Sequence, residues 1–334
     1  MLNQDQIQQL NKLEENTHHT EFKQLAERMT SQGINVEGVL NQLKNLKVAI
    51  PSWALGSGGT RFGRYLFGGA PRNLFEKIED VGLLHQLTAN ADSISLHIPW
   101  DIPKDITAIK EAASAYKLRF DAVNSNTFQD QVDQQYSYKF GSLSHVEKEV
   151  RAQAIAHNKE VIQLGTALGS KSITVWLADG SNFPGQNNFQ TALEHTQNSL
   201  QQITHALPDD WKIFIEYKPY EPHFYSTVIQ DWGTSFLLAN ACGPKAFTLV
   251  DLGHHLPNTN IEQIVATLMM QGKLGGFHFN DSKYGDDDVT VGSIQPYKLF
   301  LIFNELVHGM AKNTNNPHLS WMIDASHNTK DPLE

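Results

Sequence analysis

The feature that most constrains this chain is an alternation of helical and extended patterns along most of its length. Eight segments are apolar inside and become polar only toward their carboxyl ends, as strands buried on both faces do. They are residues 48–53, 94–100, 120–126, 172–179, 212–218, 246–254, 274–280 and 318–324. Helical periodicity precedes the last seven, at residues 73–90, 104–117, 146–168, 188–206, 223–241, 260–272 and 296–311. We therefore expect parallel strands joined by crossover helices.

Eight such units predict an α/β chain folded as a (β/α)8 barrel, the TIM barrel, in which functional side chains gather at the carboxyl ends of the strands. A doubly wound open sheet is the structural alternative. It would concentrate its polar residues at one switch point and would usually carry a glycine-rich dinucleotide fingerprint after an early strand. The sequence has no such fingerprint, so we interpret residues 48–334 as one catalytic barrel.

Two segments lie outside this repeat. Residues 1–47 are polar, have apolar residues at helical spacing and break at Ser31-Gln32-Gly33, which predicts two helices that pack on the barrel. At the other end, Asp331-Pro332 is a suitable cap and first turn for an eighth helix, but the sequence stops at Glu334. We expect the last barrel helix and a C-terminal extension to be missing, so that the barrel is truncated after its eighth strand.

A glycine-rich loop, Gly56-Ser57-Gly58-Gly59-Thr60-Arg61-Phe62, follows the first predicted strand. It lacks the lysine of a phosphate-binding P-loop and does not open directly into a helix. A flexible or closely packed loop is therefore favoured, and phosphate binding is the alternative.

The charge balance limits the partners of this chain. Lys and Arg number 26 against 36 Asp and Glu, a formal charge of −10, which disfavours nucleic acid and anionic membranes as partners. Cys242, the single cysteine, excludes an internal disulfide and fits a reducing compartment. The first residues have no secretory signal pattern, and no apolar run approaches the roughly 20 residues that span a bilayer. These features predict a soluble cytoplasmic protein.

The stretch from Leu274 to Asp288 indicates what the strand ends carry. It begins as an apolar strand and ends in a polar run with His278, Asp281 and three consecutive aspartates at 286–288. Imidazole and carboxylate groups suit Mn²⁺, Co²⁺, Zn²⁺ or Mg²⁺, and three adjacent carboxylates repel one another without a nearby cation. A solvated acidic loop is the alternative for this stretch alone. Metal binding is favoured because other predicted strands end in the same way.

Acidic residues and histidines recur at the ends of the last four predicted strands. The first set ends these strands and comprises Glu216, Asp251, His278 and Asp324. The second set follows close behind and comprises His254, Asp286 and Asp288. Because strand ends converge on one mouth of a barrel, we expect the first set to hold a divalent cation and the second to form another site beside it. Any one of these residues alone would more often be a hydrogen-bonded structural group.

Side chains suited to a small polyhydroxylated ligand accompany these sets. Trp53, Trp100 and Trp176 lie at strand ends, where their flat faces can pack on the C–H groups of a sugar. Lys218 can hold an anionic or polarised oxygen, and His97 can transfer a proton near neutral pH. Packing within the core is the alternative role for the tryptophans.

Six longer motifs are distinctive. They are Pro-Ser-Trp at 51–53, Ser-Leu-His-Ile-Pro-Trp at 95–100, Asn-Ser-Asn-Thr-Phe at 124–128, Asp-Gly-Ser-Asn-Phe-Pro-Gly-Gln at 179–186, Val-Asp-Leu-Gly-His-His at 250–255 and Gly-Phe-His-Phe-Asn-Asp-Ser-Lys-Tyr-Gly-Asp-Asp-Asp at 276–288. Together they resemble the broad-specificity bacterial branch of the L-rhamnose isomerases, over nearly the whole chain. The resemblance implies an aldose–ketose isomerase with a xylose isomerase-like barrel, which is a homotetramer and uses Mn²⁺ or a similar ion.

The resemblance also implies roles for individual residues. A structural cation would be held by Glu216, Asp251, His278 and Asp324, and a catalytic cation by His254, Asp286 and Asp288. The positions that match substrate contacts are Trp53, His97, Phe128, Trp176 and Lys218. Catalytic positions are His97 near the sugar ring oxygen, Lys218, Asp324, and Ser326 close to a cation-bound water. Family chains continue through the eighth helix and further helices, and this sequence departs from them there.

These assignments imply reversible conversion of L-rhamnose to L-rhamnulose, with other aldoses accepted. The open-chain sugar would bind with O1 and O2 near two divalent cations and Lys218. Hydride would move between C2 and C1 while water activated by a cation carries the proton between O2 and O1. Glu216 and Asp251 would be ligands rather than free bases, because a cation keeps them ionised.

Other functions are alternatives. A ketose 3-epimerase on a related barrel would transfer a proton through an enediol and would need a free pair of carboxylates at the reacting carbon. A non-catalytic sugar-binding or metal-storage barrel would bind without turnover. A metal-dependent endonuclease is disfavoured by the negative charge of the chain.

Overall fold

The computed structural model describes residues 4–55, 69–313, 318–325 and 333. Three of the features predicted above lie outside these residues. They are the glycine-rich loop 56–62, Ser326 and the start of an eighth helix at Asp331-Pro332.

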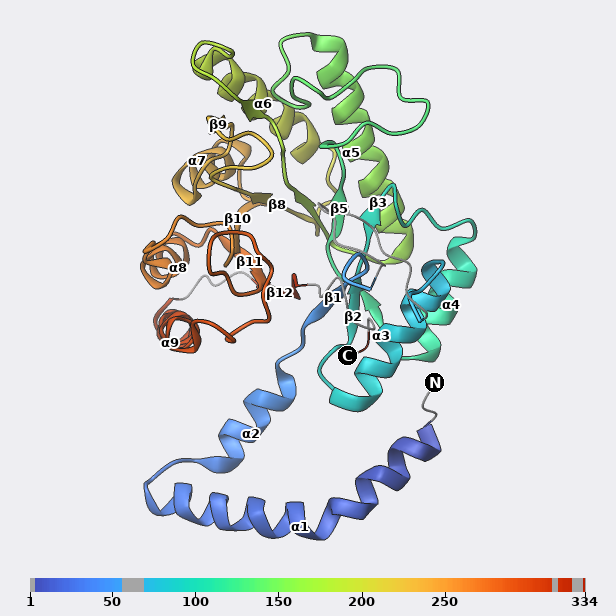
Figure 1. The fold of residues 1–334 in the computed structure, drawn as a ribbon, viewed down its shortest axis with the longest axis vertical. Coiled ribbons are helices and arrows are strands. Elements are labelled where there is room, and N and C mark those ends of the chain that lie inside the picture. Colours follow the sequence, from blue (N-terminus) through green and yellow to red (C-terminus); the bar gives the residue numbers. More distant parts are fainter. Residues whose placement is uncertain (1–3, 56–68, 314–317, 326–332, 334) are drawn as a thin grey trace.

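Within the described residues, ten strands form one parallel sheet (Figure 1). They are β1 (Ala49–Pro51), β2 (Ser93–Ser95), β3 (His97–Ile98), β4 (Arg119–Phe120), β5 (Val123–Ser125), β6 (Ser172–Val175), β8 (Lys212–Glu216), β10 (Ala246–Asp251), β11 (Leu274–Phe279) and β12 (Ser320–Ile323). A separate antiparallel pair joins β7 (Gly180–Ser181) to β9 (Ser226–Thr227).

The ten strands correspond to the eight predicted ones, because two of these are each divided in two. Only Leu96 separates β2 from β3, and two residues separate β4 from β5. β2 pairs with β4 and β3 pairs with β5, while β12 pairs with β1, so the parallel pairing continues around all eight. The predicted α/β TIM barrel is therefore confirmed.

In the part of the chain that the structure describes, seven helices surround this sheet (Figure 1). They are α3 (Leu74–Thr88), α4 (Ile106–Ala115), α5 (Lys148–Leu168), α6 (Phe189–Thr204), α7 (Trp232–Cys242), α8 (Ile261–Met270) and α9 (Pro296–Lys312). Each lies where helical periodicity predicted a helix. The predicted start of α7 at residue 223 is wrong, because Ser226–Thr227 pairs with Gly180–Ser181 instead. The helix begins only after Asp231, whose carboxylate accepts the N–H of Thr234 at 2.7 Å.

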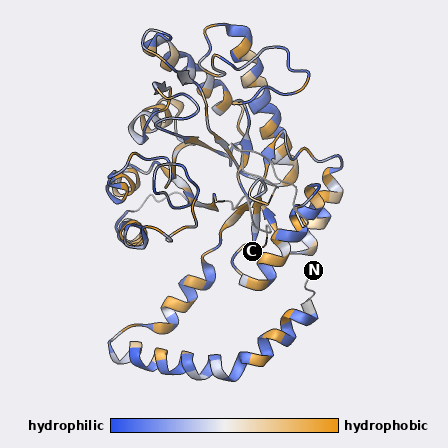
Figure 2. Ribbon diagram, viewed as in Figure 1, coloured by the Kyte–Doolittle hydropathy of each residue, from blue (hydrophilic) through white to orange (hydrophobic). Residues whose placement is uncertain are grey.

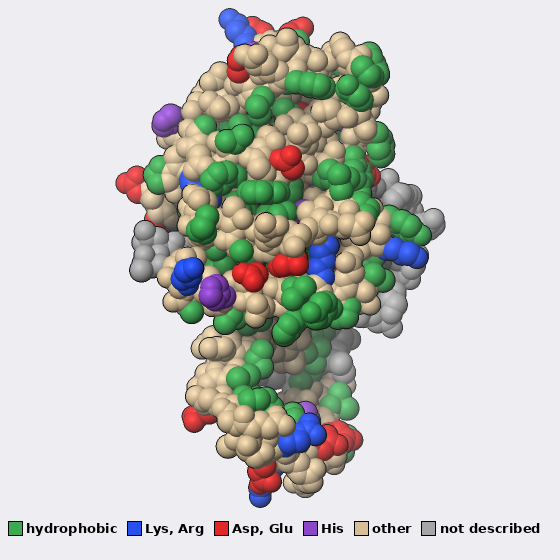
Figure 3. Space-filling view, turned by 90° about the vertical axis from the view of Figure 1, so that its left-hand side faces the viewer, with side chains coloured by type: hydrophobic (Ala, Val, Ile, Leu, Met, Phe, Trp, Pro, Cys, Tyr) green, Lys and Arg blue, Asp and Glu red, His purple; other side chains and the backbone are tan. Residues whose placement is uncertain are grey.

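The apolar strand residues pack against the inner faces of these helices, and the hydropathy colouring in Figure 2 shows them as orange segments of the sheet. Close packing also fixes one glycine. A Cβ on Gly275 would lie 2.6 Å from the ring of Phe214 and 2.8 Å from Phe247 Cβ, so no larger residue fits there. In Figure 3, which shows the side of the molecule at the left of Figure 1, apolar side chains are scattered among charged ones.

The N-terminal segment forms two helices, α1 (Gln4–Ser31) and α2 (Val36–Asn45), as the periodicity predicted. Figure 1 shows that both extend away from the barrel. Ile7 is buried, but Leu13 is 77% exposed and Leu43 55% exposed. A domain boundary at residue 47 and packing of this segment on the barrel stay predictions. None of the helices in the described ranges has the length and apolar character needed to cross a membrane.

Candidate metal centre

Four neighbouring strands deliver an acidic or imidazole side chain to the same mouth of the barrel. Glu216 and Asp251 are the last residues of β8 and β10, and His278 lies one residue before the end of β11. Asp251 pairs in register with His278, so their side chains lie beside each other. Asp324 directly follows β12, and its backbone N–H donates to Phe279 O. The apolar residues of β8, β10 and β11 are buried, which fixes the positions of their polar ends.

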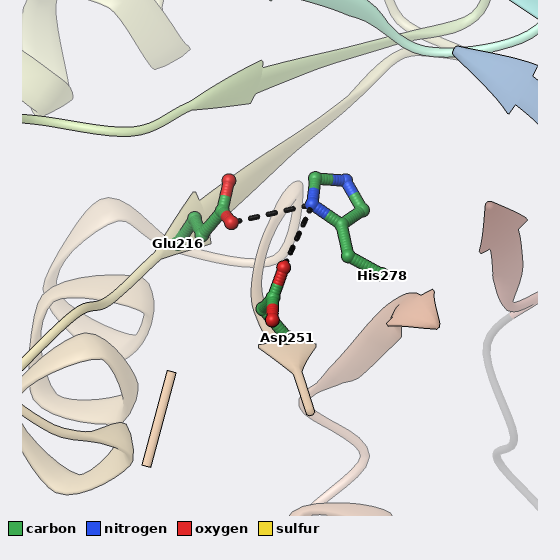
Figure 4. A group of neighbouring side chains, drawn as sticks. All are labelled: Glu216, Asp251 and His278. Atoms are coloured by element: carbon green, nitrogen blue, oxygen red, sulfur yellow. Dashed lines mark hydrogen bonds and ion pairs between the residues drawn. The ribbon is translucent and has the colours of Figure 1, made fainter. Parts of the chain in front are cut away.

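The carboxylates of Glu216 and Asp251 point toward Nδ1 of His278 (Figure 4). This atom lies 3.2 Å from Glu216 Oε1, 3.7 Å from Asp251 Oδ2 and 3.4 Å from Asp324 Oδ2. Ligand atoms of Glu216, Asp251 and His278 all lie within 4.8 Å of one another, and all three residues are buried. One nitrogen and several carboxylate oxygens around one point are a suitable donor set for a divalent cation.

Hydrogen bonds to residues around this cluster orient its carboxylates. Asp251 Oδ1 accepts from the backbone N–H of Gly253 at 2.8 Å and from Asn280 Nδ2 at 2.9 Å, which turns Oδ2 toward His278. Trp53 Nε1 donates to Asp324 Oδ1 at 2.9 Å. Such outer contacts fix ligand orientation in metal sites.

The second predicted set lies beside the first, and His254 connects the two. Its Nδ1 is 3.3 Å from Glu216 Oε1 and its Nε2 is 2.9 Å from Asp286 Oδ1. Asp286 Oδ2 also contacts the ammonium of Lys218, which lies 3.1 Å from Glu221 Oε2. Asp288 lines the same cavity. The structure thus brings all three residues to one mouth, with His254 and Asp286 arranged as an ion-paired group.

The electrostatics of the mouth favour a bound cation. Burial by itself opposes a charge on His278, but the carboxylates of Glu216, Asp251 and Asp324 outweigh it and raise its pKa well above the usual value. Burial likewise opposes charge on His254, yet Asp251, Asp286 and Glu216 raise its pKa to about 9. Without a metal, protons on the imidazoles offset the negative charge. Metal binding would displace those protons, so the residues present fit a divalent cation.

A cavity of about 500 Å³ opens beside these residues, and an aromatic wall lines its other side. The wall consists of Trp53, His97, Trp100, Phe128 and Trp176. Their rings are in mutual contact, with centroid distances from 4.0 to 6.2 Å. Lys218 Nζ lies 5.3 Å from the centroid of the Trp176 ring and so joins the wall to the acidic half. All three tryptophans line this cavity, opposite its acidic residues. The volume of the cavity and its mixed lining suit a small molecule with apolar and hydroxyl groups.

Burial also affects the protonation of His97. Its ring stacks on Trp100 at a centroid distance of 4.0 Å, and burial lowers its pKa to about 3 even though Asp101 opposes that shift. Burial therefore disfavours the charged imidazole, and a proton-transfer role for His97 stays a prediction. In its neutral form the ring can donate one hydrogen bond and accept another.

Comparison with known proteins identifies the family. A model described as a xylose isomerase-like TIM barrel matches residues 87–326, more than half of the chain. The chain belongs to this family. A Rhizobium meliloti (strain 1021) protein named "Probable sugar isomerase" is 55% identical over 314 residues, which are 94% of this chain and 73% of that protein. A protein of the same description from Mesorhizobium japonicum is 53% identical over the same shares.

Solved structures of this fold extend the comparison. A structure of L-ribulose 3-epimerase superimposes with a TM-score of 0.60 and covers 84% of this chain and 82% of its own. The two sequences are 14% identical. The similarity supports the barrel fold.

The charges at the mouth predict how the metal-free protein responds to pH. The folded pKa of His254, about 9, lies above the ordinary 6.5, so its proton stabilises the folded state below pH 6.5. This stabilisation is lost as pH rises through 9, and at about 1.4 kcal/mol per pKa unit it is on the order of 3 kcal/mol. We expect the melting temperature in chelator, followed by calorimetry, to fall over this window. With excess Mn²⁺ the fall should disappear, and a rise in chelator would contradict the arrangement.

Three further residues at the mouth were not predicted from the sequence. Asn280 orients Asp251, and Glu221 pairs with Lys218. Asn124 donates from Nδ2 to Ser95 Oγ at 2.9 Å and lines the cavity. Asn280 and Asn124 lie inside motifs that the sequence analysis had already singled out, and Glu221 is three residues after Lys218. Their roles depend on neighbours in space, which motif spacing does not give.

Proposed function

We propose that this protein is a metal-dependent aldose–ketose isomerase that interconverts L-rhamnose and L-rhamnulose (EC 5.3.1.14) and accepts other aldoses. The observation that carries the proposal is the buried cluster of Glu216, Asp251 and His278 beside a cavity of about 500 Å³ with an aromatic wall. The names of the two relatives support a sugar isomerase, and the six sequence motifs favour L-rhamnose as the aldose. We further propose that the protein assembles as a homotetramer.

Two groups of residues would hold divalent cations, with Mn²⁺ as the proposed resident. The first is Glu216, Asp251, His278 and Asp324, and the second is His254, Asp286 and Asp288. Bound there, the cations would polarise O1 and O2 of the open-chain sugar and lower the pKa of adjacent water.

The residues of the chain bind and orient the sugar around this centre. Lys218 is buried at the border of the acidic and aromatic halves, where its ammonium can stabilise negative charge that develops on O1. Trp53, Phe128 and Trp176 pack on the carbon skeleton and exclude water from it. His97, neutral at physiological pH, accepts a hydrogen bond from a ring hydroxyl and so assists ring opening. Ser326 is proposed to orient the nearby water.

The hydrogen atom moves directly between C2 and C1 in this proposal. The strand-end acids Glu216, Asp251 and Asp324 face His278, and in the following loop Asp286 faces His254 and Lys218. None of these four acids is placed as an unengaged base above a sugar carbon. Proton transfer through an enediol, as a 3-epimerase would use, requires such a base. The arrangement therefore favours hydride shift.

We expect metal-stripped protein resupplied with Mn²⁺ and L-rhamnose in D₂O to form L-rhamnulose without deuterium at C1. The sugar would be freed of metal and analysed by NMR, with chelator-treated protein as the control that forms no ketose. Deuterium at C1 would retain an isomerase but exclude the hydride shift. Absence of ketose with every aldose tested, while Mn²⁺ still binds, would exclude the isomerase and leave the sugar-binding alternative.

A further inference from the structure

The loop between β11 and α9 carries three consecutive aspartates, and the middle one has no role in the proposed function. Asp286 and Asp288 are assigned to the second cation. The side chain of Asp287, in contrast, folds back on its own loop, where its carboxylate contacts residues 282–285.

The contacts of this carboxylate involve both of its oxygens. Oδ1 accepts from Ser282 Oγ at 2.7 Å and from the backbone N–H of Gly285 at 2.8 Å. Oδ2 accepts from the backbone N–H of Lys283 at 2.8 Å and of Tyr284 at 3.1 Å. These four donors tie four successive residues of the loop to the carboxylate of Asp287. Because its oxygens already accept these hydrogen bonds, the carboxylate is poorly suited to bind a cation.

The backbone on either side of Asp287 needs such support. Asp286 has φ +54° and Asp288 has φ +46°, both in the left-handed region that residues other than glycine rarely adopt. Without such support, Asp286 and Asp288 would favour backbone conformations with negative φ, and their carboxylates would then point in other directions than in this structure. Conformations of this kind persist only where the surroundings hold them in place.

The rest of the loop is fixed at its base and on one flank. Asp281 and Val289 exchange two backbone hydrogen bonds of 2.9 and 2.7 Å, which close the base. Asp286 N–H donates to Gly253 O at 2.9 Å. Gly285 lies so close to Tyr220 that a Cβ there would come within 1.5 Å of the phenol oxygen. The turn at 282–285 is the part that Asp287 holds.

We propose that Asp287 is a positioning residue for a second divalent cation, because it fixes the loop in the form that turns Asp286 and Asp288 together toward the cavity. The inference rests on the second cation site of the proposed function. It adds that the middle aspartate acts through its two neighbours and is not itself a ligand.

Calorimetric titration of the metal-free full chain with Mn²⁺ tests this inference. For Asp287→Ala we expect the second binding step to weaken by about 10- to 100-fold, the usual effect of losing an outer contact of a metal site, while the first step is unchanged. Asp287→Asn keeps one acceptor oxygen and should lie between Asp287→Ala and the unmodified protein. Asp105→Asn is the matched control, because Asp105 also accepts a backbone N–H, from Ala108 at 3.0 Å, but at the exposed start of α4 and outside the residues that line the cavity.

The possible outcomes separate this inference from the proposed function. Two unchanged binding steps in Asp287→Ala would overturn the positioning role alone, and equal weakening of both steps would reduce Asp287 to a structural residue. A single step in the unmodified protein would overturn the second site and the inference with it. Hydrogen exchange gives an independent readout, since the amides of residues 283–285 should be protected in the metal-free protein and lose protection in Asp287→Ala.

Discussion

Replacing Glu216 with glutamine should lower kcat by about a thousandfold or more, because one carboxylate oxygen serves both parts of the centre. Glu216 Oε1 lies 3.2 Å from His278 Nδ1 and 3.3 Å from His254 Nδ1. A cation that polarises a substrate oxygen contributes several kcal/mol to the transition state, and each 1.4 kcal/mol or so is worth about tenfold in rate. Loss of this ligand should therefore weaken Mn²⁺ binding and catalysis together, as measured by calorimetry and by the rate of ketose formation.

Glu194→Gln is the matched control for this substitution. Glu194 lies on the surface of α6, where its carboxylate accepts only from Gln190 Nε2 at 2.8 Å among the contacts of the described residues. Its replacement should leave both readouts unchanged. A Glu216→Gln protein that binds Mn²⁺ normally and retains more than about a tenth of the activity would show that Glu216 is not a metal ligand.

The part of the site that could be predicted from the sequence follows from strand direction. Glu216 and Asp251 end apolar segments, and His278 lies one residue before the end of another. Parallel strands place all their carboxyl ends at one edge of a sheet. Their proximity therefore needed no knowledge of individual contacts. The barrel itself was predictable for the same reason, since an alternation of buried strands and amphipathic helices has few other solutions.

The features that could not be predicted depend on contacts between distant residues. The protonation of His97 follows from its burial against Trp100, which a sequence motif does not express. The late start of α7 follows from pairing of β9 with β7, whereas helical periodicity is a local signal. The left-handed backbone of Asp286 is likewise unexpected from residue type, because it depends on what the loop contacts.

Replacing Lys218 with methionine should lower kcat by about 10²- to 10³-fold while binding of Mn²⁺ is maintained or strengthened. Methionine retains the apolar length of the side chain over Trp176 but removes the ammonium that would stabilise charge on O1. The same ammonium contacts Asp286 Oδ2 and lies 3.1 Å from Glu221 Oε2. Removing it leaves both carboxylates more attractive to a cation, so metal affinity and catalysis should change in opposite directions.

Lys212 provides a control on the same strand. It begins β8 at the opposite end of the barrel, where Nζ donates to His318 O at 2.8 Å and lies 5.4 Å from the centroid of the Phe247 ring. Lys212→Met removes a half-buried ammonium that lies far from the mouth, so any loss of kcat in this variant would measure only the effect on folding.

If Lys218→Met loses Mn²⁺ affinity along with activity, the ammonium of Lys218 supports the metal site and does not act on the sugar. If Lys218→Met retains its kcat, Lys218 neither supports the metal site nor stabilises charge on the sugar. Among the residues that the structure describes, no other lysine or arginine lines the cavity beside the metal centre, so none could replace the charge of Lys218.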